Sequence, residues 1–240
     1  MNGALRAPML ASYATGPKFT PLPPVVPEVT SYWDERHEMS VDPTTDADVA
    51  DQNGVRHLVF LARVDDESVR ETLRPTLDAL SEFDCLAVVP EQYLHVTVTI
   101  AGNVGSGQRL SEHEEERVAA AGRTAFADAS AFEVTFPQLD LFPSVVFASV
   151  DDGGSFEGLN ERACGIDGIE VHGRDEGYVP HLTLAQFRSR DEYEDLLAWL
   201  ESNRSLEAPS TRVTDVDLVA VDRDERFPEF ETVARYPLAH

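Results

Sequence analysis

The chain has 240 residues, of which 44 are acidic and 19 are basic, so its formal net charge is −25. Such a field repels nucleic acids and anionic surfaces, which excludes binding by bulk electrostatic attraction and requires a local pocket for any anionic ligand. Because 42% of the residues are hydrophobic and every basic residue except Lys18 is an arginine, we expect a folded, salt-adapted protein. A salt-rich cytoplasm would screen its self-repulsion, since the Debye length near 1 M salt is about 3 Å.

Residues 1–54 differ in composition from the remainder of the chain. The stretch GPKFTPLPPVVPEV (16–29) is proline-rich, and VDPTTDADVADQNG (41–54) is acidic and rich in turn residues. The acidic stretch lacks the spacing and the final glutamate of a calcium loop. We therefore expect an N-terminal extension that is poorly ordered or wrapped, followed by a domain over residues 55–240.

From Val55 onward, apolar and alternating runs predict strands, and helical periodicity predicts helices between them. Ser111 and Glu114 have the spacing of a capping box, and Pro75 is expected to kink or shorten its helix. The predicted helices cover 65–83, 111–130, 155–166 and 191–203; the predicted strands cover 55–64, 85–90, 94–102, 132–151 with a turn at Phe142-Pro143, 178–187, 212–223 and 230–238. Each half of this order offers strands and a helix. The fold class predicted is α+β and bilobed, with a mainly antiparallel sheet in each of two similar lobes, helices outside and a cleft between the sheets.

No run of about 20 apolar residues is present, and no charged segment followed by an apolar one opens the chain. We therefore expect a cytoplasmic protein that does not bind a membrane. Cys85 and Cys164 stand far apart and outside any Cys/His cluster, so neither a zinc site nor a disulfide framework is predicted.

Two of the predicted strands carry the same polar sequence. YLHVTVTI (93–100) and YVPHLTLAQF (178–187) each hold an aromatic residue and then His-x-Thr. Because side chains alternate along a strand, His95 and Thr97 point to one face, as do His181 and Thr183. With seven histidines in the chain, one His-x-Thr is unremarkable, whereas two in matching strands indicate function.

Two histidines that face one cleft suit phosphodiester chemistry near neutral pH. Since the ordinary pKa of histidine is near 6.5, one ring can be neutral and take a proton while the other is protonated and gives one to the departing oxygen. The threonine hydroxyls, about 7 Å along the strand from their histidines, can donate hydrogen bonds to phosphate oxygens. This chemistry requires no metal and no cofactor.

The motifs HVTVTIAG (95–102) and PHLTLAQF (180–187) resemble the two signature motifs of the 2H phosphoesterase superfamily. The nearest branch is the 2′-5′ RNA ligase family, also described as RNA 2′,3′-cyclic phosphodiesterases, and the acidic surface suggests a haloarchaeal-like member. The resemblance covers roughly residues 55–238. It implies a bilobed α+β fold with a central cleft, no cofactor, and a substrate that is an RNA end or a nucleotide bearing a cyclic phosphate.

The resemblance also implies roles for individual residues. His95 and His181 would be the acid–base pair, in an order that depends on the direction of reaction, and Thr97 and Thr183 would hold the phosphate. Tyr178 is either a residue that borders the base or ribose or an edge-strand aromatic.

One departure concerns the position after the second motif, where many members carry an arginine and this chain has Gln186. A glutamine cannot supply that charge. Arg188, two residues later, is the candidate replacement, although strand alternation would turn both side chains away from the face of the histidine. This departure weakens the case for RNA ligation.

Alternatives to a cyclic phosphodiesterase, with or without reversible 2′-5′ RNA ligation, stay open. A hydrolase of another cyclic nucleotide phosphodiester, such as an ADP-ribose cyclic phosphate, would use the same cleft. A binding module for RNA ends or nucleotides would keep the cleft without turnover, but the intact histidine pair favours an enzyme. A metal site at the two histidines lacks carboxylate or thiolate ligands at useful spacing. No stable protein partner is indicated.

Overall fold

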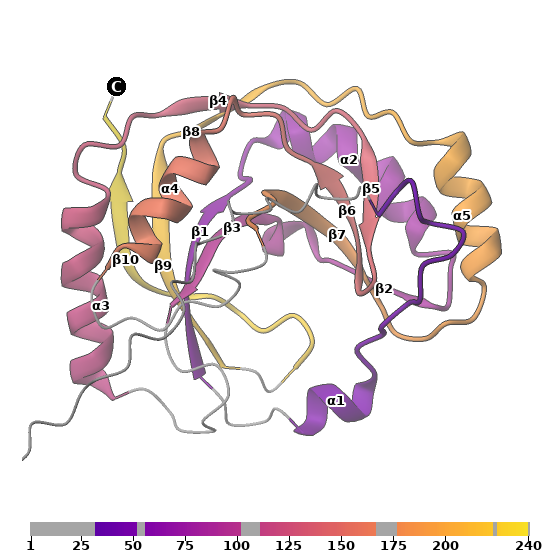
Figure 1. The fold of residues 1–240 in the computed structure, drawn as a ribbon, viewed down its shortest axis with the longest axis horizontal. Helices are drawn as coiled ribbons and strands as arrows, with labels where there is room; N and C mark the ends of the chain where they lie inside the picture. The colour runs from indigo at the N-terminus through magenta and orange to yellow at the C-terminus, as the bar shows by residue number, and fades with distance from the viewer. Residues whose placement is uncertain (1–31, 52–55, 102–110, 167–176, 223–224, 240) are drawn as a thin grey trace, which may run out of the picture. The chain divides into compact units, whose positions relative to one another are not determined.

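The computed structural model describes residues 32–51, 56–101, 111–166, 177–222 and 225–239. Their main feature is an antiparallel sheet in the order β10-β9-β1-β3-β7-β6-β5, with β2 beside β7 (Figure 1). The strands are β1 (Arg56–Arg63), β2 (Leu86–Val88), β3 (His95–Ala101), β5 (Leu139–Phe142), β6 (Val145–Ser149), β7 (His181–Phe187), β9 (Asp215–Asp222) and β10 (Glu231–Pro237). A small second sheet pairs β4 (Phe132–Val134) with β8 (Thr211–Val213). The predicted α+β class with antiparallel sheets is confirmed.

The large sheet consists of two halves that meet between β3 and β7. Strands β10, β9, β1 and β3 form the first half, and β7, β6, β5 and β2 form the second. Only one residue pair, Val96 with Leu182, joins β3 to β7, whereas β1 pairs with β3 through six residues. The two halves can therefore diverge on either side of this single contact.

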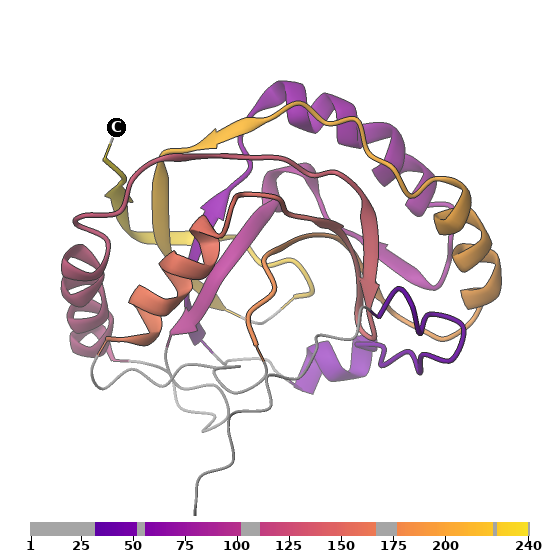
Figure 2. The ribbon, with the colours of Figure 1, turned by 45° about the horizontal axis from the view of Figure 1, so that its top comes forward.

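In the described part of the chain, four α-helices cover the two halves, and a fifth, α1 (Asp46–Asp51), precedes β1. Helices α3 (Glu112–Ala125) and α4 (Ser155–Cys164) pack on β10 and β3 of the first half, while α2 (Glu67–Leu80) packs on β2 and β7 of the second. Helix α5 (Tyr193–Ser202) lies beside α2 on that side (Figures 1 and 2). The two lobes therefore do not correspond to the N-terminal and C-terminal halves of the sequence. Helix α2 comes from the first half of the sequence and packs on β7 of the second half, whereas α4 comes from the second half and packs on β3 of the first.

Local sequence explains where the helices begin. The Asp66 side chain caps α2 by accepting a hydrogen bond from the backbone N–H of Ser68, and the predicted capping box of Ser111 and Glu114 opens α3. Helix α2 runs through Pro75 to Leu80. Pro75 lies on the exposed face of α2, opposite the buried residues Val69, Leu73 and Leu77 that hold the helix against the sheet.

Residues 32–51, the described part of the predicted extension, contact the second half of the sheet. Trp33 and Val41 are buried, and the guanidinium of Arg204 lies 3.9 Å from the centre of the Trp33 ring. The backbone N–H of Thr44 donates to the carbonyl of Phe187, the last residue of β7, at 2.9 Å. This segment therefore runs past the end of a His-x-Thr strand. The domain boundary at residue 54 stays a prediction, and residues 1–31 lie outside the described residues.

Within the described ranges, none of the helices has the length and apolar character needed to cross a membrane.

Candidate active site

The junction of β3 and β7 brings the two His-x-Thr sequences together. Side chains of directly opposed residues lie on the same face of an antiparallel pair, and the opposed Val96 and Leu182 are both buried. The residues on either side of each therefore point to the other face. In a regular ladder this register sets each histidine directly opposite the threonine of the other strand. It also makes His95 and His181 diagonal neighbours, with about 7–8 Å between their Cα atoms.

Each of these strands contains a bulge at the same place. In β3, Thr97 and Thr99 pair with successive residues of β1, so Val98 is the extra residue. In β7, Leu184 is extra in the same way opposite β6. A bulge reverses the alternation of side chains from that point on. The burial patterns of the two strands are accordingly identical, and the half-buried positions after the threonine are Ile100 and Gln186.

The bulge changes the expected facing of Gln186. Strict alternation would turn it away from the histidine, but the extra residue Leu184 returns it to the face of His181 and Thr183. Arg188 follows the end of β7 and is exposed, and its guanidinium pairs with Asp46 at 3.0 Å.

Backbone carbonyls fix the tautomer of both histidines. Nδ1 of His95 lies 2.6 Å from the carbonyl oxygen of Tyr93, and Nδ1 of His181 lies 2.8 Å from that of Val179. A carbonyl can only accept, so Nδ1 carries the hydrogen in each ring. Nε2 is then the ring nitrogen with a lone pair that can accept a proton, and both histidines are oriented alike.

Each histidine also lies against two aromatic rings that stack on one another. The ring of His95 meets Tyr93 and Phe230 edge-on, with centroids 5.2 and 5.0 Å away, and these two rings stack at 4.3 Å. The ring of His181 meets Phe142 and Phe147 at 5.1 and 5.4 Å, and these stack at 4.4 Å. Six aromatic or imidazole rings thus form two similar clusters. The aromatic rings hold the imidazoles in place and shield them from water.

Shielding from water lowers the pKa of both histidines. Burial is the largest cause for His95, whose pKa falls to about 4, and the charges of His181 and Arg63 lower it further. Burial also lowers the pKa of His181. The charge of His181 is one of the smaller causes of the lowered pKa of His95, so the two rings are near enough to interact electrostatically. Both are neutral at pH 7 in the ligand-free protein.

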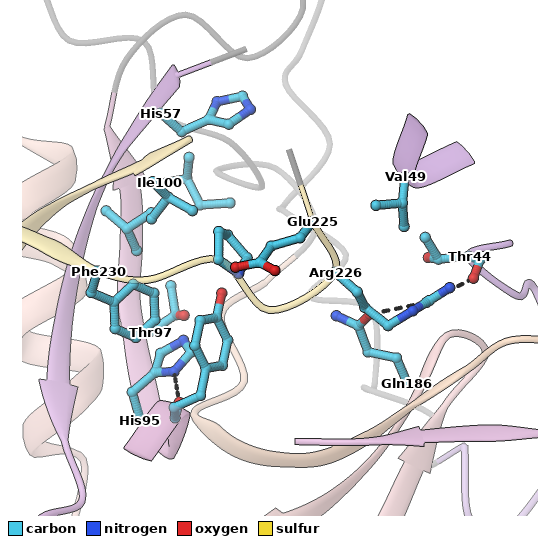
Figure 3. Close-up of a pocket in the computed structure, with 14 residues that line it drawn as sticks. Thr44, Val49, His57, His95, Thr97, Ile100, Gln186, Glu225, Arg226 and Phe230 are labelled. Atoms are coloured by element: carbon cyan, nitrogen blue, oxygen red, sulfur yellow. Dashed lines mark hydrogen bonds between the residues drawn. The ribbon is translucent and has the colours of Figure 1, made fainter. Parts of the chain in front are cut away.

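A pocket of about 210 Å³ opens beside His95 and Thr97 (Figure 3). It extends toward β7 and the segment before β1, and does not include His181 or Thr183. The wall nearest His95 carries the stacked pair of aromatic rings, and the opposite wall carries Arg226. The lining residues are Thr44, Val49, His57, Val59, Tyr93, His95, Thr97, Ile100, Gln186, Val221, Glu225, Arg226, Pro228 and Phe230.

Two residues predicted to touch substrate have other contacts. The hydroxyl of Tyr178 donates to the backbone carbonyl of Thr97 at 2.8 Å, so it links the approach to β7 with the first motif. Neither Tyr178 nor Arg188 lines the pocket.

Several pocket residues escaped the sequence analysis. Thr44 belongs to the predicted extension, and Arg226 and Phe230 come from the turn between β9 and β10. No local pattern marks them, because they reach the site only through the sheet order. Tyr93 carried a signal, since both motifs have an aromatic residue shortly before the histidine. His57 also lines the pocket.

Among the residues that the structure describes, no group of three or more His, Cys, Asp or Glu side chains could hold a metal ion.

Comparison with known proteins identifies the family. A sequence model of the 2′-5′ RNA ligase superfamily matches residues 59–225, which include both His-x-Thr strands. The chain belongs to this superfamily. One curated relative is the RNA 2′,3′-cyclic phosphodiesterase of Archaeoglobus fulgidus, which is 26% identical over 140 residues, covering 55% of this chain and 74% of the relative.

Two solved structures share the fold described above. TT0787 of Thermus thermophilus is 21% identical with a TM-score of 0.57, over 76% of this chain and 97% of that one. E. coli LigT complexed with 3′-AMP is 15% identical with a TM-score of 0.56, over 77% and 99%. The superfamily match ends before Arg226 and Phe230 and begins after the segment that contributes Thr44.

Proposed function

We propose that this chain is a metal-independent 2H phosphoesterase that opens 2′,3′-cyclic phosphates on RNA ends or nucleotides. The observation that carries the proposal is the junction of two His-x-Thr strands through Val96 and Leu182, which turns four polar side chains to one face. Superfamily membership supports it, as does the relationship to a cyclic phosphodiesterase. A LigT structure contains 3′-AMP, the kind of product that such a reaction releases.

The reaction needs two proton transfers. The unprotonated Nε2 of one histidine takes a proton from water as the water oxygen bonds to phosphorus. The bond between phosphorus and one ribose oxygen breaks, and the second histidine gives its Nε2 proton to that oxygen. The hydroxyls of Thr97 and Thr183 donate to the non-bridging oxygens, where negative charge increases. The products are a phosphomonoester and a neighbouring ribose hydroxyl.

The surroundings of the histidines favour one assignment in the hydrolytic direction. His95 has a pKa of about 4, so it is the better candidate for the base, and His181 is then the acid. A bound phosphate raises the pKa of both rings, because an opposite charge nearby favours the protonated form. Substrate binding therefore supplies the protonated histidine that the ligand-free site lacks at pH 7.

A parallel step, in which a different hydroxyl attacks the same cyclic phosphate, also forms part of the proposal. With an RNA 5′-hydroxyl in place of water, the same acid–base pair would join two RNA ends, which is reversible 2′-5′ ligation. We assign this reaction to the same residues and place both activities in a salt-rich cytoplasm, as the net charge of −25 suggests.

A second candidate is a binding module for RNA ends or nucleotides. The observation that favours it is that both histidines are neutral near pH 7 without ligand. Such a module would bind a cyclic phosphate and release it unchanged.

The experiment is incubation of adenosine 2′,3′-cyclic phosphate with the protein in molar KCl and EDTA, followed by separation of the 2′- and 3′-phosphates. Formation of one of the two isomers supports the enzyme. Binding of the cyclic phosphate without product supports the binding module, and neither binding nor product refutes both.

A further inference from the structure

We infer that Arg226 forms a second anion site beside the reaction centre, where it binds the phosphate on the 5′ side of the terminal nucleotide. The inference rests on the proposed function and specifies it, because it predicts a preference for substrates that carry a 5′-phosphate.

The first argument is the direction in which the pocket extends. Arg226 donates to the side-chain oxygen of Gln186 at 3.4 Å, and the bulge in β7 sets Gln186 on the face of Thr183. Gln186 lies three residues beyond Thr183, which is about 10 Å along the strand. Arg226 is therefore displaced from the histidine pair along β7, and it meets a different part of the substrate from the reacting phosphate.

The second argument is the way Arg226 is held. One terminal nitrogen donates to the carbonyl of Thr44 at 2.8 Å as well as to Gln186, and the other donates to Asp46 at 2.8 Å. These contacts with described residues use three of the five N–H donors of a guanidinium. The side chain is only 12% exposed, yet it lines the pocket (Figure 3). Arg226 is thus fixed in place with donors left for a ligand.

The third argument is the local charge. Asp46 pairs with Arg226 and with Arg188, so two guanidinium groups share one carboxylate and Asp46 alone does not neutralise both, although Asp48 and Glu225 also bring carboxylates near Arg226. The chain as a whole carries −25, so an anion here is held by the aimed N–H donors of Arg226 and not by a net positive field.

The fourth argument is the surface between the two anion sites. Tyr93 and Phe230 line the pocket and lie against the ring of His95, and Arg226 lies on the other side from His95 and Phe230 (Figure 3). Stacked aromatic rings present the flat apolar surface that a nucleobase or ribose can cover. A nucleoside between these rings and Gln186 would direct its cyclic phosphate to the histidines and its 5′-phosphate to Arg226.

Glu225 opposes this attraction. Its side chain also lines the pocket, beside Arg226 in the same turn, and its carboxylate repels a phosphate. Its removal is therefore expected to strengthen the same preference that removal of Arg226 abolishes.

The test compares adenosine 2′,3′-cyclic phosphate with its 5′-phosphorylated form, which differ by one phosphate. We expect the wild-type kcat/KM to be about tenfold higher for the 5′-phosphorylated substrate, since a hydrogen-bonded charge pair is worth about one order of magnitude. Arg226→Gln should abolish this preference and Arg226→Lys should restore part of it. Arg188→Gln is the matched comparison, because it also removes one positive charge paired with Asp46, and it should keep the preference. Glu225→Gln leaves the anchors of Arg226 intact and should increase the preference.

Several outcomes overturn the inference. It is wrong if the wild type does not distinguish the two substrates, if Arg226→Gln keeps the preference, or if Arg188→Gln loses it. If the wild type turns over neither substrate, the proposed reaction fails, and the second anion site is then tested by measuring binding affinities. The wild type should then bind adenosine 3′,5′-bisphosphate about tenfold more tightly than adenosine 3′-phosphate, and Arg226→Gln should bind the two equally. Equal affinities in the wild type would overturn the inference.

Discussion

His95→Asn is expected to make the fold less sensitive to mild acid. The surrounding rings lower the pKa of His95 from 6.5 to about 4, so between these values the unfolded chain takes up a proton at this residue and the folded protein does not. Stability therefore falls as the pH decreases below 6.5, and above that pH the residue contributes no pH dependence. Asparagine does not titrate, and its amide N–H can still donate to the Tyr93 carbonyl that His95 contacts.

The magnitude follows from the two pKa values. A histidine with a pKa of 6.5 when unfolded and about 4 when folded lowers the free energy of unfolding by about 2 kcal/mol between about pH 7.5 and about pH 5. His181 has a lowered pKa as well, but it is present in both proteins and largely cancels in their difference.

The assay is urea unfolding of wild type and His95→Asn at both pH values in the same molar KCl. We expect the stability difference between the two proteins to shift by about 2 kcal/mol in favour of the variant at the lower pH. A difference that is the same at both pH values would mean that His95 titrates normally, and the inference that its aromatic neighbours desolvate it would be wrong.

Three further properties follow from the structure. The kcat/KM for a cyclic nucleotide should give a bell-shaped pH profile, with an acid limb near pH 4 and an alkaline limb below pH 6.5, because the pKa of both histidines is lowered. An alkaline limb above pH 7 contradicts this. Gly122→Ala should destabilise the protein by about 1–3 kcal/mol in urea unfolding despite better helix propensity, because the new Cβ would lie 2.7 Å from the Tyr236 ring and hydroxyl; an unchanged or higher urea midpoint argues against it. The urea midpoint should rise between about 0.1 and about 2 M KCl as salt screens the net charge of −25, and a flat response would speak against salt adaptation.

The parts of the structure that sequence could predict are those encoded by local pattern. Side-chain alternation placed His95 with Thr97, and His181 with Thr183, on shared faces, and the burial patterns of β3 and β7 agree. The capping box at Ser111 is likewise a short-range signal, and the helix begins where it predicts.

Other parts depend on pairing between distant strands, which no local pattern contains. The bulges at Val98 and Leu184 arise from register with β1 and β6, so the facing of Gln186 could not be predicted from its own strand. Arg226 reaches the pocket because β9 pairs with β1, and Thr44 because its segment meets the end of β7. Which half of the large sheet α2 and α4 cover likewise depends on tertiary packing, since the apolar pattern of either helix would suit either half.

The central claim is that His95 and His181 act as one acid–base pair. The most direct measurement is the rate of hydrolysis of adenosine 2′,3′-cyclic phosphate, with EDTA in molar KCl, by the wild type, His95→Asn, His181→Asn and the double variant. We predict that each single variant loses a factor of about 10²–10⁴ and that the double variant loses little more than the worse single one, because neither histidine completes the reaction alone. Near wild-type turnover in either single variant, with the protein folded, would contradict the two-histidine mechanism.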